Sequence, residues 1–120
     1  VQPWLDSLAY RLDTEEGSIV ITGDTRPCDS VRDLATDADL MLCLCAYVQE
    51  EIDGTPEAEY MCGSTAAAEM AQAAGAKKLA LVHQAPALDA PGQTERALRD
   101  ISAAYDGQVI WGREMVSFEV

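Results

Sequence analysis

The stretch Ser18-Ile19-Val20-Ile21-Thr22-Gly23-Asp24-Thr25 decides the fold, because an apolar strand ends there at a carboxylate. A second apolar strand, Lys78-Leu79-Ala80-Leu81-Val82-His83, ends at the only histidine of the chain. Metal sites are built from carboxylates and imidazoles, and ligand sites gather at the ends of buried strands. One carboxylate and one histidine cannot complete such a site, so we expect the chain to contribute part of an active site.

Composition indicates one globular domain with a strong negative charge. The chain has 120 residues, of which 48% are hydrophobic, and this is enough for one core. Twenty-one acidic residues against eight basic ones give a net charge of −13, which disfavours contact with phosphate backbones. No apolar run approaches the roughly 20 residues of a membrane span, and no signal-peptide pattern opens the sequence. We therefore expect neither nucleic acid nor a membrane as a partner, and a cytoplasmic location.

The cysteines are expected to be reduced thiols without a structural metal. The four are Cys28, Cys43, Cys45 and Cys62, and none forms a C-x-x-C pair with a second pair at zinc-finger spacing. Cys43 and Cys45 lie two positions apart in an apolar strand and share a face, so we expect both to be buried as small hydrophobic side chains.

Hydrophobic periodicity and turn residues predict an α/β layered arrangement. We expect strands at 7–12, 18–22, 39–45, 78–83, 108–111 and 115–120. Helices are expected at 28–35 and 94–105, and a third, alanine-rich helix should be capped by Ser64 or Thr65 and end at Gly75. The first two strands form a hairpin around a turn at 13–17. The acidic stretch 46–62 is either a solvated surface loop or an active-site flap.

Four short runs carry a resemblance to a known family. They are Gly-Asp-Thr-Arg-Pro (23–27), Ala38-Asp39-Leu40, Ser64-Thr65-Ala66-Ala67 and Leu79-Ala80-Leu81-Val82-His83. In this order they resemble the second half of the metallo-β-lactamase fold, and within it the branch of ribonuclease Z-like and arylsulfatase-like hydrolases. The segments 106–110 and 115–120 are similar to that branch's C-terminal strands. The resemblance implies that residues 1–120 form a single half-domain, the C-terminal half of an αββα sandwich.

The resemblance also implies a metal-dependent hydrolase with two divalent metal ions, expected to be zinc, with iron or manganese as alternatives. Asp24 would bridge the two metals and act in catalysis, and His83 would bind the second metal. The family's His-x-His-x-Asp-His motif lies in its first half, and nothing here matches it. We therefore expect a hetero-oligomer in which a second protein chain carries that motif across a large, obligate interface. A fragment of a longer chain is the other explanation.

Two departures from the branch bear on the substrate. Ribonuclease Z-type sequences carry a His-Glu pair where this chain has Cys43-Leu44, and a histidine where it has Gly63. Leu44 cannot hold a proton and Gly63 has no side chain, so general acid catalysis at these positions is absent. Together with the negative charge, this predicts a small-molecule substrate rather than tRNA.

Without a general acid, the substrate should have a leaving group that departs as a stable anion. The metals would lower the pKa of a bound water to about 7, giving a hydroxide that attacks the substrate. Activated esters, lactones, sulfate esters and electron-poor aryl ethers such as a nitroanisole fit this requirement, and the last would make the chain a subunit of an O-demethylase. Leu44 and Gly63, with Tyr47 and Tyr60, are expected to line a pocket that suits an aromatic ring.

Two other functions remain open. The chain could be a non-catalytic subunit that scaffolds a complete partner enzyme, as the losses at Leu44 and Gly63 suggest. A flavodoxin-like or nucleotide-binding module shares the α/β pattern, but neither G-x-G-x-x-G nor G-x-x-x-x-G-K-[ST] is present.

Overall fold

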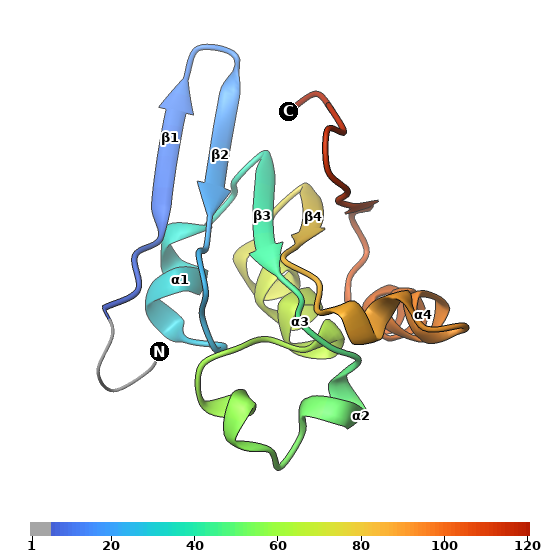
Figure 1. The fold of residues 1–120 in the computed structure, drawn as a ribbon. Helices are drawn as coiled ribbons and strands as arrows, with labels where there is room; N and C mark the ends of the chain where they lie inside the picture. The colour runs from blue at the N-terminus through green and yellow to red at the C-terminus, as the bar shows by residue number, and fades with distance from the viewer. Residues whose placement is uncertain (1–5) are drawn as a thin grey trace.

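A five-stranded sheet organises residues 6–120, the part of the chain that the computed structural model describes (Figure 1). Its strands, in spatial order, are β1 (Tyr10–Thr14), β2 (Gly17–Ile21), β3 (Leu40–Leu44), β4 (Lys78–Val82) and β5 (Gln108–Trp111). β1 pairs antiparallel with β2, and β2 to β5 pair in parallel. Parallel neighbours need crossovers that run over a face of the sheet, and this brings the helices to that face.

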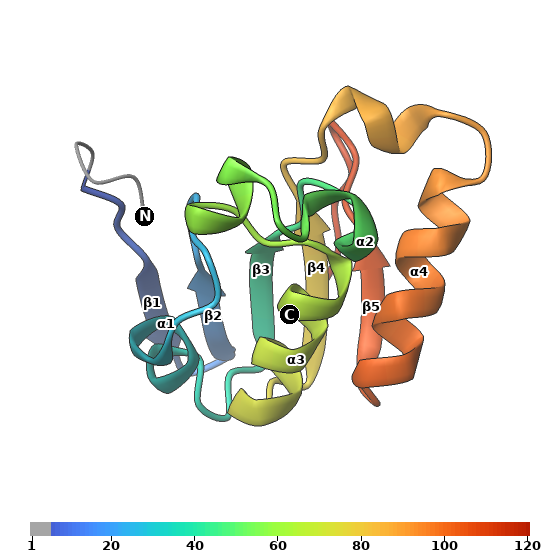
Figure 2. The ribbon, with the colours of Figure 1, turned by 90° about the horizontal axis from the view of Figure 1, so that it is seen from below.

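Three helices cover one face of this sheet: α1 (Asp29–Leu34), α3 (Ser64–Ala74) and α4 (Gln93–Ala104) (Figure 2). α3 ends where expected, because Gly75 adopts the left-handed conformation (φ +71°) that closes many helices. The acidic stretch 46–62 is not a plain loop, since it contains the short helix α2 (Gln49–Ile52) and a 3-10 turn (Pro56–Glu59). A second 3-10 turn (Pro86–Asp89) lies between β4 and α4.

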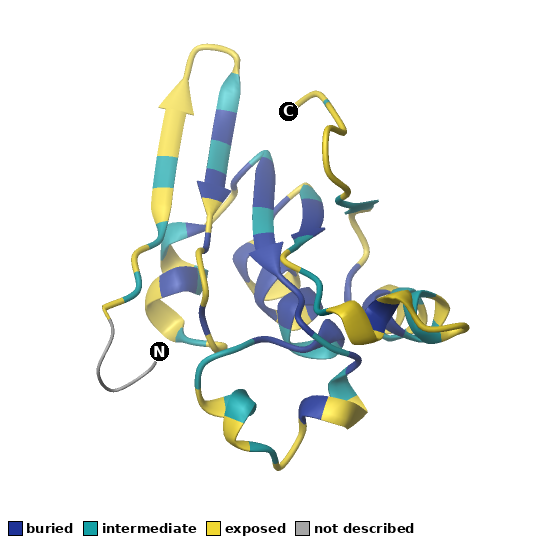
Figure 3. Ribbon diagram, viewed as in Figure 1, coloured by how far each residue is buried: buried dark blue, intermediate teal, exposed yellow. Residues whose placement is uncertain are grey.

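The core lies between the sheet and these helices. Every second residue of β2, β3 and β4 points into it, and the alanines of α3 allow that helix to pack closely. The buried side chains include Val20, Met41, Cys43, Leu79 and Leu81 from the strands and Val31, Ala67, Ala71 and Ile101 from the helices. Figure 3 shows β3 almost wholly buried and β1 largely exposed.

The opposite face of the sheet is apolar, and none of the helices within residues 6–120 covers it. Alternation along the strands puts Tyr10 and Leu12 of β1 next to Ile21 and Ile19 of β2 on this face. Tyr10, Leu12 and Ile21 are exposed large hydrophobic residues, and Leu12 keeps 60% of its surface accessible. An isolated soluble domain rarely leaves such a row uncovered.

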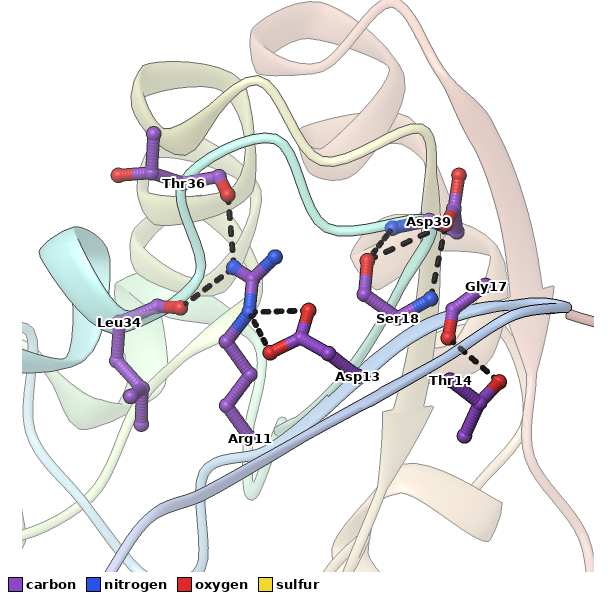
Figure 4. Close-up of polar contacts among 8 residues, drawn as sticks. All are labelled: Arg11, Asp13, Thr14, Gly17, Ser18, Leu34, Thr36 and Asp39. Carbon is purple, nitrogen blue, oxygen red and sulfur yellow. Dashed lines mark hydrogen bonds and ion pairs between the residues drawn. The ribbon is translucent and has the colours of Figure 1, made fainter.

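Polar contacts anchor the β1–β2 hairpin to the rest of the fold (Figure 4). The Arg11 guanidinium donates to the carbonyl oxygens of Leu34, the last residue of α1 (2.9 Å), and of Thr36 (2.8 Å), and also to Asp13. The Asp39 carboxylate accepts from the backbone N–H of Ser18 at 2.9 Å. These contacts tie the hairpin to the end of α1 and to the start of β3.

The expected α/β class, the hairpin and the helix–strand order are confirmed, with boundaries that move by at most three residues. Two details were wrong. Gly63, rather than Ser64 or Thr65, is the residue before α3, and no strand forms at 115–120. Within residues 6–120, no helix is long and apolar enough to cross a membrane.

Candidate metal centre

Asp24 and His83, the two candidate ligands, lie together at one edge of the sheet. Asp24 follows β2 and His83 follows β4, and both strands run parallel to β3 between them. The C-terminal ends of parallel strands meet at one edge, where α/β proteins place ligand sites. Asp24 Oδ1 lies 3.4 Å from His83 Nε2. The side chains are 60% and 61% exposed, so both remain accessible to further groups.

The backbone at both positions is unusual. Gly23 has a φ of +62°, and a Cβ there would lie 2.7 Å from the carbonyl oxygen of Leu8. Only glycine fits this close approach, which sets the turn that presents Asp24. His83 itself has a φ of +58°, in the left-handed region that few residues with a side chain adopt. Strained backbone of this kind clusters at functional sites. No local sequence pattern predicted the left-handed conformation of His83.

Asp24 and His83 each line a different hollow of the surface. Asp24 and Tyr60 line one of about 270 Å³, with Ser7, Leu8, Gly23 and Met61 around them. His83 lines another of about 490 Å³, together with Leu42, Val82 and Phe118. Of the four expected pocket residues, Tyr60 is therefore the one that shares a hollow with a candidate ligand.

Leu44 and Gly63 are buried rather than exposed to a pocket. Leu44 is 1% exposed, and its backbone N–H donates to Thr22 Oγ1 at 3.3 Å. A Cβ at Gly63 would lie 2.6 Å from Gln49 Oε1 and 2.9 Å from Ile52 Cγ2. The space beside Gly63, which was expected to belong to a pocket, is therefore filled by Gln49 and Ile52.

Gln49 is the residue that the sequence analysis missed at this position. Its side-chain oxygen accepts from the Ala66 N–H at 2.9 Å and so satisfies the first turn of α3. Tyr47 is half-buried and its backbone bridges to Gly63, so it also belongs to this packed region. Gln49 lies far from Gly63 in sequence and has no signature of a capping residue, which is why only the folded chain reveals the contact.

The buried cysteines belong to the hydrophobic core. Cys43, Cys45 and Cys62 are fully buried, as expected for the first two, and all four cysteines are free thiols. Burial raises the pKa of Cys45 to about 12, and contact with Cys62, followed by burial, raises the pKa of Cys43. Both shifts favour the neutral thiol over the thiolate, which is the form that binds metals, and neither cysteine lies in a group of three possible metal ligands within residues 6–120.

The donors present suit a divalent metal but are too few to hold one. Aspartate oxygen and neutral imidazole are both ligands of zinc, iron and manganese. Across residues 6–120, however, no three histidine, cysteine, aspartate or glutamate side chains gather so that they could hold a metal ion. A complete centre here requires donors from outside this part of the chain.

Two sets of relatives place the chain among known proteins. No protein-family profile matches it. It is 44% identical over 66 residues to ribonuclease Z of Chlamydia caviae, covering 55% of this chain and 21% of that protein. It is 27% identical over 125 residues to a putative ribonuclease Z of Mycobacterium tuberculosis, covering 99% of this chain and 55% of that protein. The chain thus spans about half, or less, of the curated relatives it matches.

Solved structures share its fold. The metallo-β-lactamase fold protein YhfI of Bacillus subtilis aligns with a TM-score of 0.70 at 24% identity, over 85% of this chain and 39% of that one. Human tRNase Z, short form, aligns with a TM-score of 0.66 at 18% identity, over 93% of this chain and 37% of that one. At these identities the likeness establishes the fold alone. It agrees with the expected half of a metallo-β-lactamase sandwich.

The relatives correct the expected substrate. We expected a small molecule and no nucleic acid, from the charge and from the residues at Leu44 and Gly63. The sequence relatives described above are ribonucleases, and one structural neighbour is a tRNase, so this expectation is wrong. Net charge was a poor guide because it describes this chain alone, which spans only 21% and 55% of these two relatives.

Proposed function

Because the chain is a ribonuclease Z-like C-terminal half of the metallo-β-lactamase superfamily, we propose that it supplies Asp24 and His83 to a two-metal centre that hydrolyses RNA. The remaining donors would come from the part of the sandwich that the relatives have and this chain does not match, called here the complementary half. Residues 1–120 then act as one half-domain. Asp24 would bridge the metals and His83 would bind one of them.

The observation that carries this proposal is the 3.4 Å approach of Asp24 Oδ1 to His83 Nε2 at the ends of two parallel strands. A carboxylate has two oxygens and can bridge two cations, whereas an imidazole nitrogen binds one. Divalent metals held there would lower the pKa of a bound water to about 7. Gly23 and the left-handed backbone of His83 fix where the two side chains point.

The charge of the chain suggests a division of labour in binding RNA. A net charge of −13 repels phosphates, whose binding needs lysine and arginine side chains. We therefore infer that most phosphate contacts come from the complementary half, while this chain contributes metal ligands. The general acid would also lie elsewhere, since Leu44 is buried and Gly63 has no side chain.

A second candidate is a scaffolding role without catalysis. Its support is the packing of Gln49 and Ile52 into the space beside Gly63, which leaves no room there for a reactive side chain. In that case this chain would give structural support only. The complementary half, together with another chain, would hold the metals without Asp24 or His83.

Metal content of the assembled protein distinguishes the two candidates. We would substitute Asp24→Asn and His83→Gln, with Asp89→Asn as the matched control, because Asp89 is exposed in the 3-10 turn Pro86–Asp89. Losing even an outer partner of a ligand costs about 10–100-fold in affinity, so each site variant should lower metal affinity by more than about 100-fold. Elemental analysis and metal titration measure this, and RNA hydrolysis should fall in parallel.

The control variant should keep wild-type metal content and activity. If Asp24→Asn and His83→Gln also keep both, the proposed metal centre is wrong and the scaffolding role is favoured. If metal content falls while the protein hydrolyses RNA normally, the metals are not catalytic.

A further inference from the structure

The C-terminal segment Val116–Val120 has the pattern of a strand but makes no strand in this chain. Apolar Val116, Phe118 and Val120 alternate with Ser117 and Glu119, and alternation of this kind is typical of a β-strand with one buried face. Yet no secondary structure forms there. Among residues 6–120, no backbone–backbone hydrogen bond involves residues 117–120.

The segment is nevertheless held in place over the face of the sheet that carries no helix. Just after β5 ends, the Gly112 N–H donates to the Leu81 carbonyl at 2.8 Å. Near its end, Lys78 Nζ donates to the Glu119 carbonyl at 3.0 Å, and Val120 packs beside Gly17. Figure 1 shows the segment returning along the strands toward the turn between β1 and β2.

Contact between the segment and the sheet is incomplete. Val116 and Phe118 line the hollow of about 490 Å³ whose floor includes Leu42 and Val82. Val116 and Val120 remain 48% and 43% exposed. The segment therefore leaves apolar side chains partly uncovered, and the backbone N–H and C=O groups of 117–120 without backbone partners.

We propose that Val116–Val120 is a docking strand, which pairs along its backbone with an edge strand of the complementary half when the sandwich closes. An unpaired strand with one apolar face is a template for adding a strand. The occupant follows from length, since this chain covers 55% of the Mycobacterium tuberculosis relative and 37–39% of the structural neighbours. The uncovered apolar row of Tyr10, Leu12 and Ile21 lies on the same face as the docking strand, so one partner can cover both.

Pairing would also give the docking strand a role in the assembly that is separate from the metals. The segment starts beside the hollow that contains His83, so closing it would fix the wall of that hollow. This inference rests on the complementary half of the proposed function, but it concerns backbone pairing and needs no metal.

Amide hydrogen exchange tests the proposal on the isolated chain and on the assembled protein. In the isolated chain, the amides of residues 117–120 should exchange like those of an unfolded peptide, while those of β3 and β4 are protected. In the assembled protein, alternate amides of the docking strand should slow by about 100-fold or more, because an edge strand presents every second N–H to its partner. The assembled Asp24→Asn variant should show the same protection, which separates this test from that of the metal centre.

A pair of matched variants tests the face of the strand. Phe118→Asp puts a charge on the apolar side and should weaken assembly by at least about tenfold, whereas Ser117→Asp on the other side should leave it near wild type. Both variants should fold as isolated chains, with β3 and β4 amides still protected.

Three outcomes would overturn the proposal. The amides of 117–120 could already be protected in the isolated monomer, which would make the segment part of this chain's own fold. They could become protected only in a homodimer seen by sedimentation, which would make a second copy the occupant. They could also stay unprotected in the assembled protein.

Discussion

Asp39 holds the end of the sheet that is opposite to the candidate metal centre. Its carboxylate lies 2.5 Å from Lys77 Nζ and accepts from both the backbone N–H and the hydroxyl of Ser18. The hydrogen bond from Lys77, then that from the Ser18 N–H, lowers the pKa of Asp39 from 3.8 to about 2. The side chain is 30% exposed, so solvent weakens the ion pair, but three donors still favour the charged form.

This pKa predicts an acid-dependent contribution to stability. A carboxyl group whose pKa is lower in the folded state stabilises the fold above its unfolded pKa and loses that effect as pH falls through the folded value. Asp39→Asn should therefore lower the urea midpoint at pH 5–6, and the gap to wild type should close between about pH 4 and pH 2. Asp89→Asn is the control, with no such dependence expected. A gap that stays constant from pH 6 to pH 2 would contradict the assignment.

Gly63 lies beside a space that side chains from α2 already fill. The space where a side chain would project is occupied by Gln49 and Ile52, and Gln49 also binds the Ala66 N–H. A histidine here must displace a side chain that completes the start of α3.

We expect Gly63→His to destabilise the isolated chain by about 1–3 kcal/mol, as overpacking of a well-filled site does. Adding Gln49→Ala should recover part of this loss, because it removes the nearest clashing atom, although the bond to Ala66 is lost as well. Urea unfolding of the two single variants and the double variant measures the coupling. Strictly additive effects would show that the two residues do not compete for this space.

At the scale of elements, the two faces of the sheet have different roles. One face packs on α1, α3 and α4 through alternate residues such as Met41, which is fully buried. The other face presents apolar residues such as Leu12 to solvent. Alternation along each strand makes the contrast sharp, because neighbouring residues point to opposite faces.

This contrast predicts opposite responses to the same kind of substitution. Met41→Ala should cost about 2–5 kcal/mol in the isolated chain, because it leaves a cavity in the core. Leu12→Ala should change the isolated chain by no more than about 0.5 kcal/mol, as is usual for exposed positions. In the assembled protein, Leu12→Ala should weaken association measurably. Equal costs for both variants in the isolated chain would show that the open face is already covered.

At the scale of the whole molecule, the chain is a folded unit with two incomplete features on it. The candidate metal centre has two donors, and Tyr10, Leu12 and Ile21 remain exposed on the face of the sheet opposite to the helices. Both are completed by a single partner if that partner brings a sheet and the missing ligands together. The strong negative charge fits the same arrangement, because phosphate binding is then assigned to the other half.

The sequence by itself determined the α/β class and the order of the main elements, and it singled out Asp24 and His83 as candidates, because apolar periodicity and strand ends are local properties. It also carried the resemblance to the ribonuclease Z-like branch of the metallo-β-lactamase fold, which the relatives support. Local pattern failed at Val116–Val120, whose strand needs a partner outside this chain, and at Gly63, whose space is filled by Gln49 from another element.

Only the tertiary structure decided that the two candidate ligands meet at 3.4 Å, since β3 must lie between their strands for the two ends to converge. It alone also showed the left-handed backbone of His83 and the exposed apolar row of Tyr10, Leu12 and Ile21. The physical reason is that contacts between distant segments depend on strand order and packing, which no local window of sequence contains.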